Sequence, residues 1–155
     1  MPDTVDDELP LARLLAMAFR VVTDQLHQEL AAIGHVLRPA HGFALVTIGD
    51  EGATASRLAA VLGITKQGTA KLVDGLTELG YVARQDHAGD GRARLIVLTD
   101  RGRSLLQESA AIQRRIEVGW RELLGAHDVQ VLRDGLDRAV TDAHGGGYPP
   151  LRPVW

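Results

Sequence analysis

Two polar side chains near the start of one predicted helix have the chemistry needed to read a DNA base pair. The helix is expected over residues 65–79, where apolar side chains fall on one face and Gln67 and Lys71 on the other. Glutamine can hydrogen-bond adenine bidentately, and lysine can reach guanine or a phosphate. The first turns of a recognition helix are the part that reaches base edges. Any solvent-exposed helix also turns such residues outward, so this helix alone does not establish DNA binding.

Two glycines in the same helix are a second sign that something approaches it closely. Gly68 and Gly75 each cost a helix interior about 1 kcal/mol relative to alanine. A DNA backbone or a neighbouring hairpin that comes close to the helix would account for them. A poor helix sequence that is simply tolerated is the alternative.

A predicted hairpin beside this helix carries arginines that suit DNA. Its strands are expected at residues 81–84 and 95–98, and they bear Arg84 and Arg94. The polar, glycine-rich loop between them presents Asp90 and Arg92. Narrow A·T minor grooves attract arginine, and a nearby aspartate can orient the guanidinium by a charge-assisted hydrogen bond. The alternative is a solvated turn with a surface ion pair worth up to about 1 kcal/mol.

The elements that must position these residues follow from caps, glycines and periodicity. Thr54, Thr65 and Thr99 resemble helix N-caps, and Gly63 separates two helices closely enough to indicate a helix-turn-helix. We predict, in chain order, helices over residues 9–34, 43–48, 54–63 and 65–79, the hairpin over 81–98, helices over 99–124 and 128–143, and a tail over 145–155.

The first helix carries an apolar stripe along about seven turns, at spacings of three and four residues. Its members are Leu11, Leu14, Leu15, Ala18, Val22, Leu26, Leu30 and Ile33. A stripe this long exceeds what a small domain usually needs internally. It is either core of this chain or a surface shared with a partner subunit.

Charge and composition restrict the function. The chain of 155 residues has a net charge of −3, but residues 54–103 carry +3 and the remainder −6, so the predicted DNA-reading segment is the basic part. There is no cysteine, which excludes disulfides and thiolate metal sites. No apolar run approaches the roughly 18 residues of a membrane span, and the acidic start MPDTVDDELP is unlike a secretory signal. We therefore expect a cytoplasmic protein.

Motifs of catalysis and cofactor binding are missing from the sequence. There is no Gly-x-Ser-x-Gly, no phosphate-binding glycine loop and no His-Glu-x-x-His. The six histidines are scattered, and no pair lies at i, i+4 on one helix. We expect no enzyme activity, no metal and no cofactor.

The motifs together resemble the winged helix-turn-helix of the MarR family of transcriptional regulators. The stretch from Ala53 to Gly102 holds Leu-Gly-Ile-Thr at 62–65, Lys-Leu-Val-Asp-Gly-Leu at 71–76 and Leu-Gly-Tyr-Val-Ala-Arg at 79–84. It also holds Asp-Gly-Arg at 90–92 and Leu-Thr-Asp-Arg-Gly at 98–102, which match the family's wing signature. With the flanking helices the resemblance covers roughly residues 9–143. It departs at Gly68 and Gly75, where the family often has a hydroxyl residue or arginine, and in the tail after Ala143.

The resemblance implies a mainly α fold with a small β-hairpin wing, flanked by long N- and C-terminal dimerisation helices. These are residues 9–34 and 99–143, with the DNA-binding lobe at 38–98 and tails at 1–8 and 144–155. It implies a homodimer whose two recognition helices read successive major grooves of a pseudo-palindromic operator. The expected DNA-binding residues are Thr54, Ser56, Thr65, Lys66, Gln67, Gly68, Lys71, Arg84, Asp90, Arg92 and Arg94.

Relatives in this family typically bind small, often aromatic or anionic molecules between the dimerisation helices and the lobe. The residues that could line such a cleft are Phe19, Arg20, His27, Phe43 and Trp120. We therefore expect a repressor that a small-molecule ligand relieves. The alternative is a winged-helix protein-interaction module that does not bind DNA, which the acidic total favours and Lys71 and Arg92 oppose.

Overall fold

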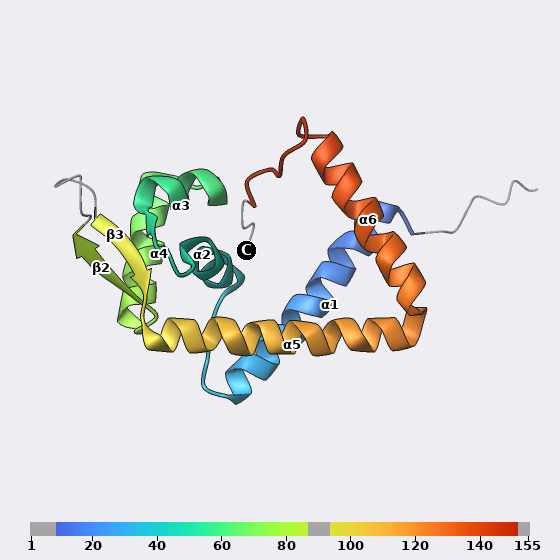
Figure 1. Cartoon of the computed structure of the whole chain (residues 1–155), viewed down its shortest axis with the longest axis horizontal. Coiled ribbons are helices and arrows are strands. Elements are labelled where there is room, and N and C mark those ends of the chain that lie inside the picture. Colours follow the sequence, from blue (N-terminus) through green and yellow to red (C-terminus); the bar gives the residue numbers. More distant parts are fainter. Residues whose placement is uncertain (1–8, 87–93, 152–155) are drawn as a thin grey trace, which may run out of the picture.

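The computed structural model describes residues 9–86 and 94–151, and it is mostly helical with one small sheet (Figure 1). The elements in chain order are α1 (Leu11–Ala32), α2 (Pro39–Ile48), β1 (Ala53–Thr54), α3 (Ala55–Leu62), α4 (Lys66–Glu78), β2 (Val82–Asp86), β3 (Arg94–Leu98), α5 (Asp100–Leu124) and α6 (Ala126–Asp142). The predicted fold class, a winged helix-turn-helix flanked by long helices, is confirmed.

The threonine caps begin three of these helices as predicted. The side-chain oxygens of Thr54, Thr65 and Thr99 accept hydrogen bonds from the third backbone N–H beyond them, at 3.2, 3.0 and 3.1 Å. The start of α2 was predicted wrongly at Phe43. The helix begins at Pro39, because proline fits the first turn of a helix, where its missing N–H is not needed.

The sheet has three antiparallel strands in the order β1-β3-β2, where the sequence predicted only a hairpin. β1 has two residues, and it pairs Ala53 with Ile96 and Thr54 with Leu95. Two residues are too few to show the alternation that indicates a strand. The hairpin itself pairs Val82 with Leu98 at its base and Asp86 with Arg94 at the last described rung.

One hydrophobic core holds the lobe of α2, α3, α4 and the sheet against the first half of α5. Tyr81, Leu45, Leu58 and Leu76 are among the side chains that are almost wholly buried there. At the start of α5, Gly102 passes so close to the wing that an added Cβ would lie 2.2 Å from the carbonyl oxygen of Tyr81. The glycine of the wing signature is therefore fixed by a backbone contact between α5 and the start of β2.

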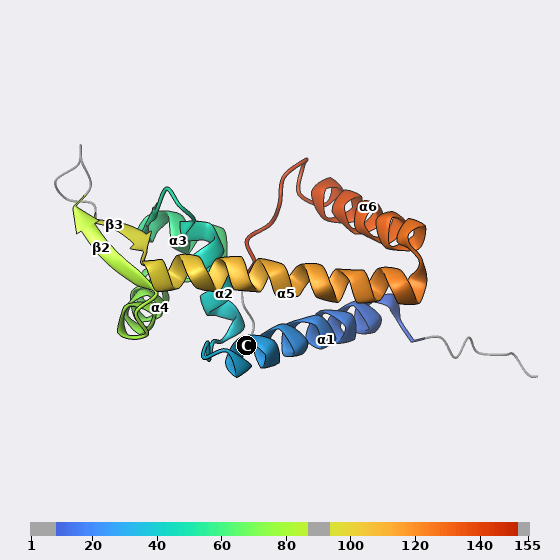
Figure 2. The same cartoon turned by 60° about the horizontal axis from the view of Figure 1, so that its bottom comes forward.

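Helices α1 and α6 pack on α5 and lie on opposite sides of it in Figure 2. The predicted stripe on α1 divides in two. Leu30 is buried, and Val22 and Leu26 pack against the core, whereas Leu14 and Leu15 nearer the start are 46 % and 37 % exposed. The single chain thus covers the stripe from Val22 to Leu30 and leaves Leu11, Leu14, Leu15 and Ile33 exposed. In the described part of the chain, no helix is long and apolar enough to cross a membrane.

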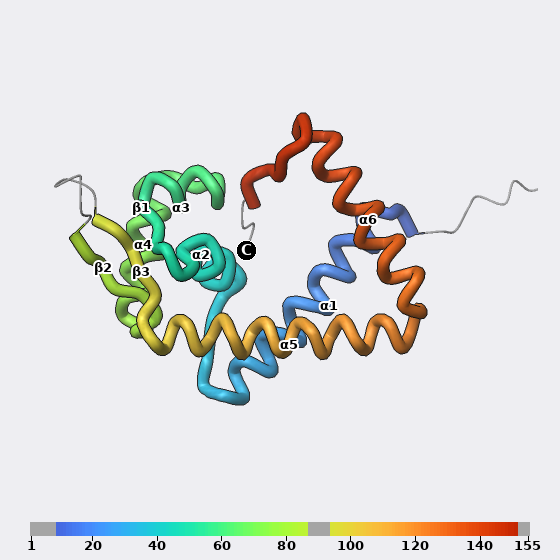
Figure 3. Tube along the Cα trace, viewed as in Figure 1, coloured from blue at the N-terminus to red at the C-terminus, as the bar shows by residue number. Residues whose placement is uncertain are grey.

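The segment after α6 turns back toward the lobe, as the red end of the tube in Figure 3 shows. The backbone N–H of Leu151 donates to the carbonyl oxygen of Val61 in the last turn of α3, at 3.2 Å. The hydroxyl of Tyr148 also donates to the carboxylate of Asp137 on α6. Residues 148–151 therefore join α6 to the helix-turn-helix of the same chain.

Candidate nucleic-acid interface

The turn between α3 and α4 has the geometry of a helix-turn-helix. Gly63 ends α3 in the left-handed conformation, with φ of 65° and ψ of 34°. A side chain is disfavoured there, which is why glycine stands at this position. The N–H of Ile64 returns to the carbonyl oxygen of Ala59 at 3.1 Å, and Thr65 then caps α4. A turn of three residues, 63–65, therefore joins the two helices.

Helix α4 presents its polar face to solvent as predicted. Thr69, Val73 and Leu76 point into the core and are at most 1 % exposed. Lys66, Gln67 and Lys71, in the first half of the helix, are all exposed. The structure therefore leaves three side chains with hydrogen-bonding or cationic groups accessible in the first half of α4.

Some of the other predicted DNA-binding residues already have a structural role. Thr54 and Thr65 use their hydroxyl oxygens as caps. Gly68 is the donor to the cap of α4, and an added Cβ would lie 3.3 Å from the Thr65 hydroxyl oxygen. Ser56, by contrast, is exposed in the first turn of α3.

The base of the wing is tied to α4 by an ion pair. A guanidinium nitrogen of Arg84 lies 2.7 Å from a carboxylate oxygen of Asp74. Arg94, on the facing strand, is exposed and stands opposite Asp86. Asp90 and Arg92, predicted at the tip, lie outside the described residues. The ion pair joins β2 to α4, and it also neutralises one of the expected cations.

A hollow of 510 Å³ lies between the start of α2 and the flank of α4 that faces away from the wing. Arg38 and His41 line it from α2, and Lys71 and Gly75 line it from α4. His41 is only 6 % exposed, and its Nδ1 accepts a hydrogen bond from the backbone N–H of Arg38 at 3.4 Å. Burial lowers the pKa of His41 below its usual value, and the nearby charge of Arg38 lowers it further. The imidazole is therefore neutral at pH 7.

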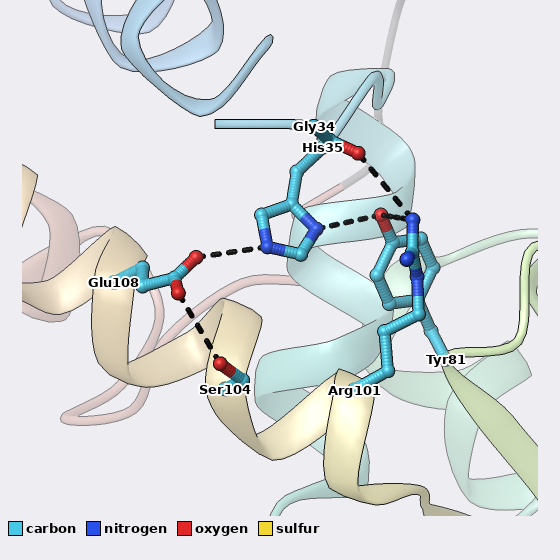
Figure 4. Close-up of polar contacts among 6 residues, drawn as sticks. All are labelled: Gly34, His35, Tyr81, Arg101, Ser104 and Glu108. Atoms are coloured by element: carbon cyan, nitrogen blue, oxygen red, sulfur yellow. Dashed lines mark hydrogen bonds and ion pairs between the residues drawn. The ribbon is translucent and has the colours of Figure 1, made fainter. Parts of the chain in front are cut away.

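A polar cluster around the buried side chains of His35 and Tyr81 joins the lobe to α5 and to the segment after α1 (Figure 4). The imidazole of His35, in the segment after α1, lies 2.8 Å from the Tyr81 hydroxyl and 2.8 Å from a carboxylate oxygen of Glu108 on α5. The Arg101 guanidinium donates to the Tyr81 hydroxyl at 3.2 Å and lies 4.8 Å from the centre of its ring. The start of the wing is thus held by groups from two other segments.

Sequence reasoning missed this cluster and the hollow beside α4. His35 and Glu108 are 73 positions apart, and each alone is an ordinary polar residue. Arg38 and His41 precede and begin α2, and only the packing of α2 on α4 brings them beside Lys71. The one local signal was Gly75, whose missing side chain opens onto the hollow.

The predicted effector residues do not gather in one place. Trp120 lines a hollow of 590 Å³ between α5 and α6. His27 lines a separate hollow of 330 Å³ near the end of α1. Arg20 is exposed and paired with Asp24, and Phe43 packs against the core from α2. Phe19 is 40 % exposed on α1. Within the described residues, no three His, Asp or Glu side chains group as a metal site requires.

The fold and the exposed face of α4 place this chain in the class of winged helix-turn-helix proteins. Residues 37–93 match the model of the MarR family. The structure of MarR from Escherichia coli superposes with a TM-score of 0.68 at 22 % identity, over 86 % of this chain and 99 % of that one. A MarR-family regulator from Rhodococcus sp. RHA1 gives a TM-score of 0.66 at 26 % identity, over 85 % and 96 %. The MepR–DNA complex from Staphylococcus aureus gives 0.70 at 20 % identity, over 87 % and 99 %.

These comparisons confirm the predicted resemblance to the MarR family, and the chain has the fold of its transcription regulators. No curated protein sequence matches the chain.

Proposed function

We propose that this chain is a sequence-specific regulator of transcription that binds double-stranded DNA with α4 in the major groove. The observation that carries the proposal is the exposed polar face of α4, with Lys66, Gln67 and Lys71 held on a capped, well-packed helix. A helix-turn-helix places its second helix in the major groove, with its first turns at the base edges. The relative MepR has been solved as a complex with DNA. Arg84, Arg94 and the predicted tip residue Arg92 would contact the adjacent minor groove or backbone.

We propose further that the protein is a homodimer. Large apolar side chains remain exposed on all three long helices, among them Leu11, Leu14, Leu15, Met17, Val118, Leu123, Val131, Leu132 and Leu136. Soluble monomers rarely expose contiguous apolar patches beyond a few hundred Å². A second copy would cover these faces with a two-fold contact. It would set two α4 helices on half-sites about one helical turn apart in a pseudo-palindromic operator.

The finer parts of the proposal rest on the family resemblance. The protein would act as a repressor in the cytoplasm, without enzyme activity, and a small molecule would relieve repression. Trp120 lies in the apolar hollow between α5 and α6, which makes it the effector candidate with the most space beside it. A winged-helix module that binds only protein is the competing function, and the Arg84–Asp74 pair favours it by removing a cation from the interface.

Selection of duplexes from a random library, followed by affinity measurements over a salt series, tests the proposal. A regulator should enrich a pseudo-palindromic sequence, and its affinity should fall steeply with salt as counterions return to the DNA. Sedimentation of the same preparation should give a dimer. Failure to enrich any duplex at low salt would favour the protein-interaction module instead.

A further inference from the structure

We infer that the hollow between α2 and α4 seats one phosphate group of the DNA backbone, with His41 as a neutral hydrogen-bond donor and Lys71 as the cation. The inference rests on the proposed function and adds a contact on the flank of α4 opposite the wing. DNA would then be held on both sides of the recognition helix.

The buried imidazole of His41 supplies the first part of the argument. Its Nδ1 accepts from the Arg38 N–H, so in the neutral ring the proton sits on Nε2. Among residues 9–86 and 94–151, Nε2 has no hydrogen-bond partner. Every side-chain nitrogen or oxygen that is sealed from solvent within the described residues does have a partner. The Nε2–H must therefore reach open space, and the space that His41 lines is this hollow.

The charges around the hollow favour an anion. Lys71 and Arg38 are both exposed at its rim and have no ion pair within the described residues. Glu78 is the single carboxylate among the lining residues, and it lies two turns further along α4 than Lys71. The first turn of α2 also lies at the hollow, and the partial positive charge of a helix N-terminus favours an anion there.

The missing side chain of Gly75 supplies an independent observation. An added Cβ at Gly75 would meet no atom within 4 Å, so packing inside the protein does not require glycine. Glycine nevertheless costs the helix stability. The backbone of α4 is left bare at the wall of the hollow, where a bulky phosphate would approach.

The location of the hollow beside α4 favours a phosphate of the DNA backbone as its ligand. The hollow lies beside the exposed face of α4 that carries Lys71, so a helix in the major groove would bring one flanking backbone strand to it. Phosphate contacts of this kind fix the register of the protein on DNA and carry no sequence information themselves.

The test replaces single backbone phosphates by uncharged methylphosphonates in a duplex that the unaltered protein has selected. Affinity should fall about tenfold at one phosphate per half-site that flanks the α4 contact. The His41→Leu and Lys71→Gln proteins already lack the contact, so replacing the same phosphate should lower their affinity little further. Lys71→Gln should also lower the salt slope by about one, while His41→Leu should leave the slope unchanged because it removes no charge.

Matched variants keep the test independent of folding. His41→Gln retains an amide donor and should restore the methylphosphonate penalty that His41→Leu loses. Gly75→Ala should weaken binding although it stabilises the helix, whereas Gly119→Ala, at an equally open site on α5, should stabilise without weakening binding. Lys71 is exposed, so its variant reports on the seat even if His41→Leu fails to fold.

Three outcomes would overturn the inference. If His41→Leu and Lys71→Gln both keep the full methylphosphonate penalty at every position, the phosphate seat is absent, although the protein still binds DNA. If no duplex is selected, the proposed function fails and the seat fails with it. If inorganic phosphate shifts the His41 Nε2 resonance in nuclear magnetic resonance spectra and the duplex does not, the hollow binds a free anion instead.

Discussion

His35 Nδ1 lies 2.8 Å from the hydroxyl oxygen of Tyr81, so the segment that ends the first long helix is hydrogen-bonded to the residue that opens the wing. Tyr81 is 1 % exposed and His35 7 %, so water does not compete for this bond. Glu108 takes the other imidazole nitrogen, also at 2.8 Å. The orientation of the lobe on α5 is thus fixed by a polar contact as well as by apolar packing.

Removing the Tyr81 hydroxyl should destabilise the protein. Tyr81→Phe keeps the ring and leaves His35 and Arg101 without their shared partner, and we expect a loss of about 1–3 kcal/mol. Urea unfolding measures it. Tyr148→Phe is the matched control, because it removes a hydroxyl whose bond to Asp137 is exposed, and its stability should hardly change. Equal losses in the two variants would contradict a structural role for the His35–Tyr81 bond.

Gly102→Ala should destabilise the protein strongly, although it adds only one methyl group. The added Cβ would lie 2.2 Å from the Tyr81 carbonyl oxygen, so α5 would have to move away from the wing. Overpacking of this kind typically costs about 1–3 kcal/mol, and here backbone must shift. Gly119→Ala in the same helix meets nothing within 4 Å and should gain up to about 1 kcal/mol. Melting temperatures of the two variants should therefore move in opposite directions.

Stability should fall on mild acidification. Burial lowers the pKa of both His27 and His41 in the folded chain, so the unfolded chain binds protons more readily. Stability is then full above the usual histidine pKa of about 6.5 and declines as the pH falls below it. His41→Gln should flatten this decline in melting temperatures measured between neutral and mildly acidic pH. A profile that His41→Gln leaves unchanged would show that His41 titrates normally.

Short-range signals made most of the fold predictable. A threonine cap or a glycine in the left-handed conformation depends on a few neighbouring residues, which is why Thr54, Gly63 and Thr65 were placed correctly. Which face of α4 packs into the core and which is exposed followed from the spacing of its apolar residues alone. β1 was missed because Ala53 and Thr54 become a strand only by pairing with β3.

Single residues of the candidate site were predictable from local patterns, but the contacts between distant segments were not. Gln67 and Lys71 share the outer face of α4 because they are four residues apart. The link between Arg84 and Asp74 spans ten positions and depends on how the wing folds against α4. His35 and Tyr81 are 46 positions apart, and no local pattern joins them.

Truncation after Ala143 should weaken the lobe and leave the proposed dimer intact. The Leu151 N–H satisfies the Val61 carbonyl at the end of α3, and residues 148–151 lie against this helix. Loss of one such bond is worth about 1 kcal/mol, or about 2–4 °C in melting temperature for a chain of this size. Sedimentation should still give a dimer, since the exposed apolar faces of α1 and α6 remain. A monomeric truncated chain would assign the tail to the dimer contact instead.

Gln67→Ala should change which sequences are bound more than how tightly DNA is held. Gln67 is exposed in the first turn of α4 and has no partner within the described chain, so its amide is free to meet a base edge. If it pairs with adenine, its loss costs about 1–3 kcal/mol at one base-pair position and relaxes selection there. Lys66→Ala is the control on the neighbouring residue. If Lys66 contacts a phosphate, its loss should weaken binding to all sequences alike. Library profiles of the two variants separate these effects, and a Gln67→Ala profile with no position-specific change would refute base reading by Gln67.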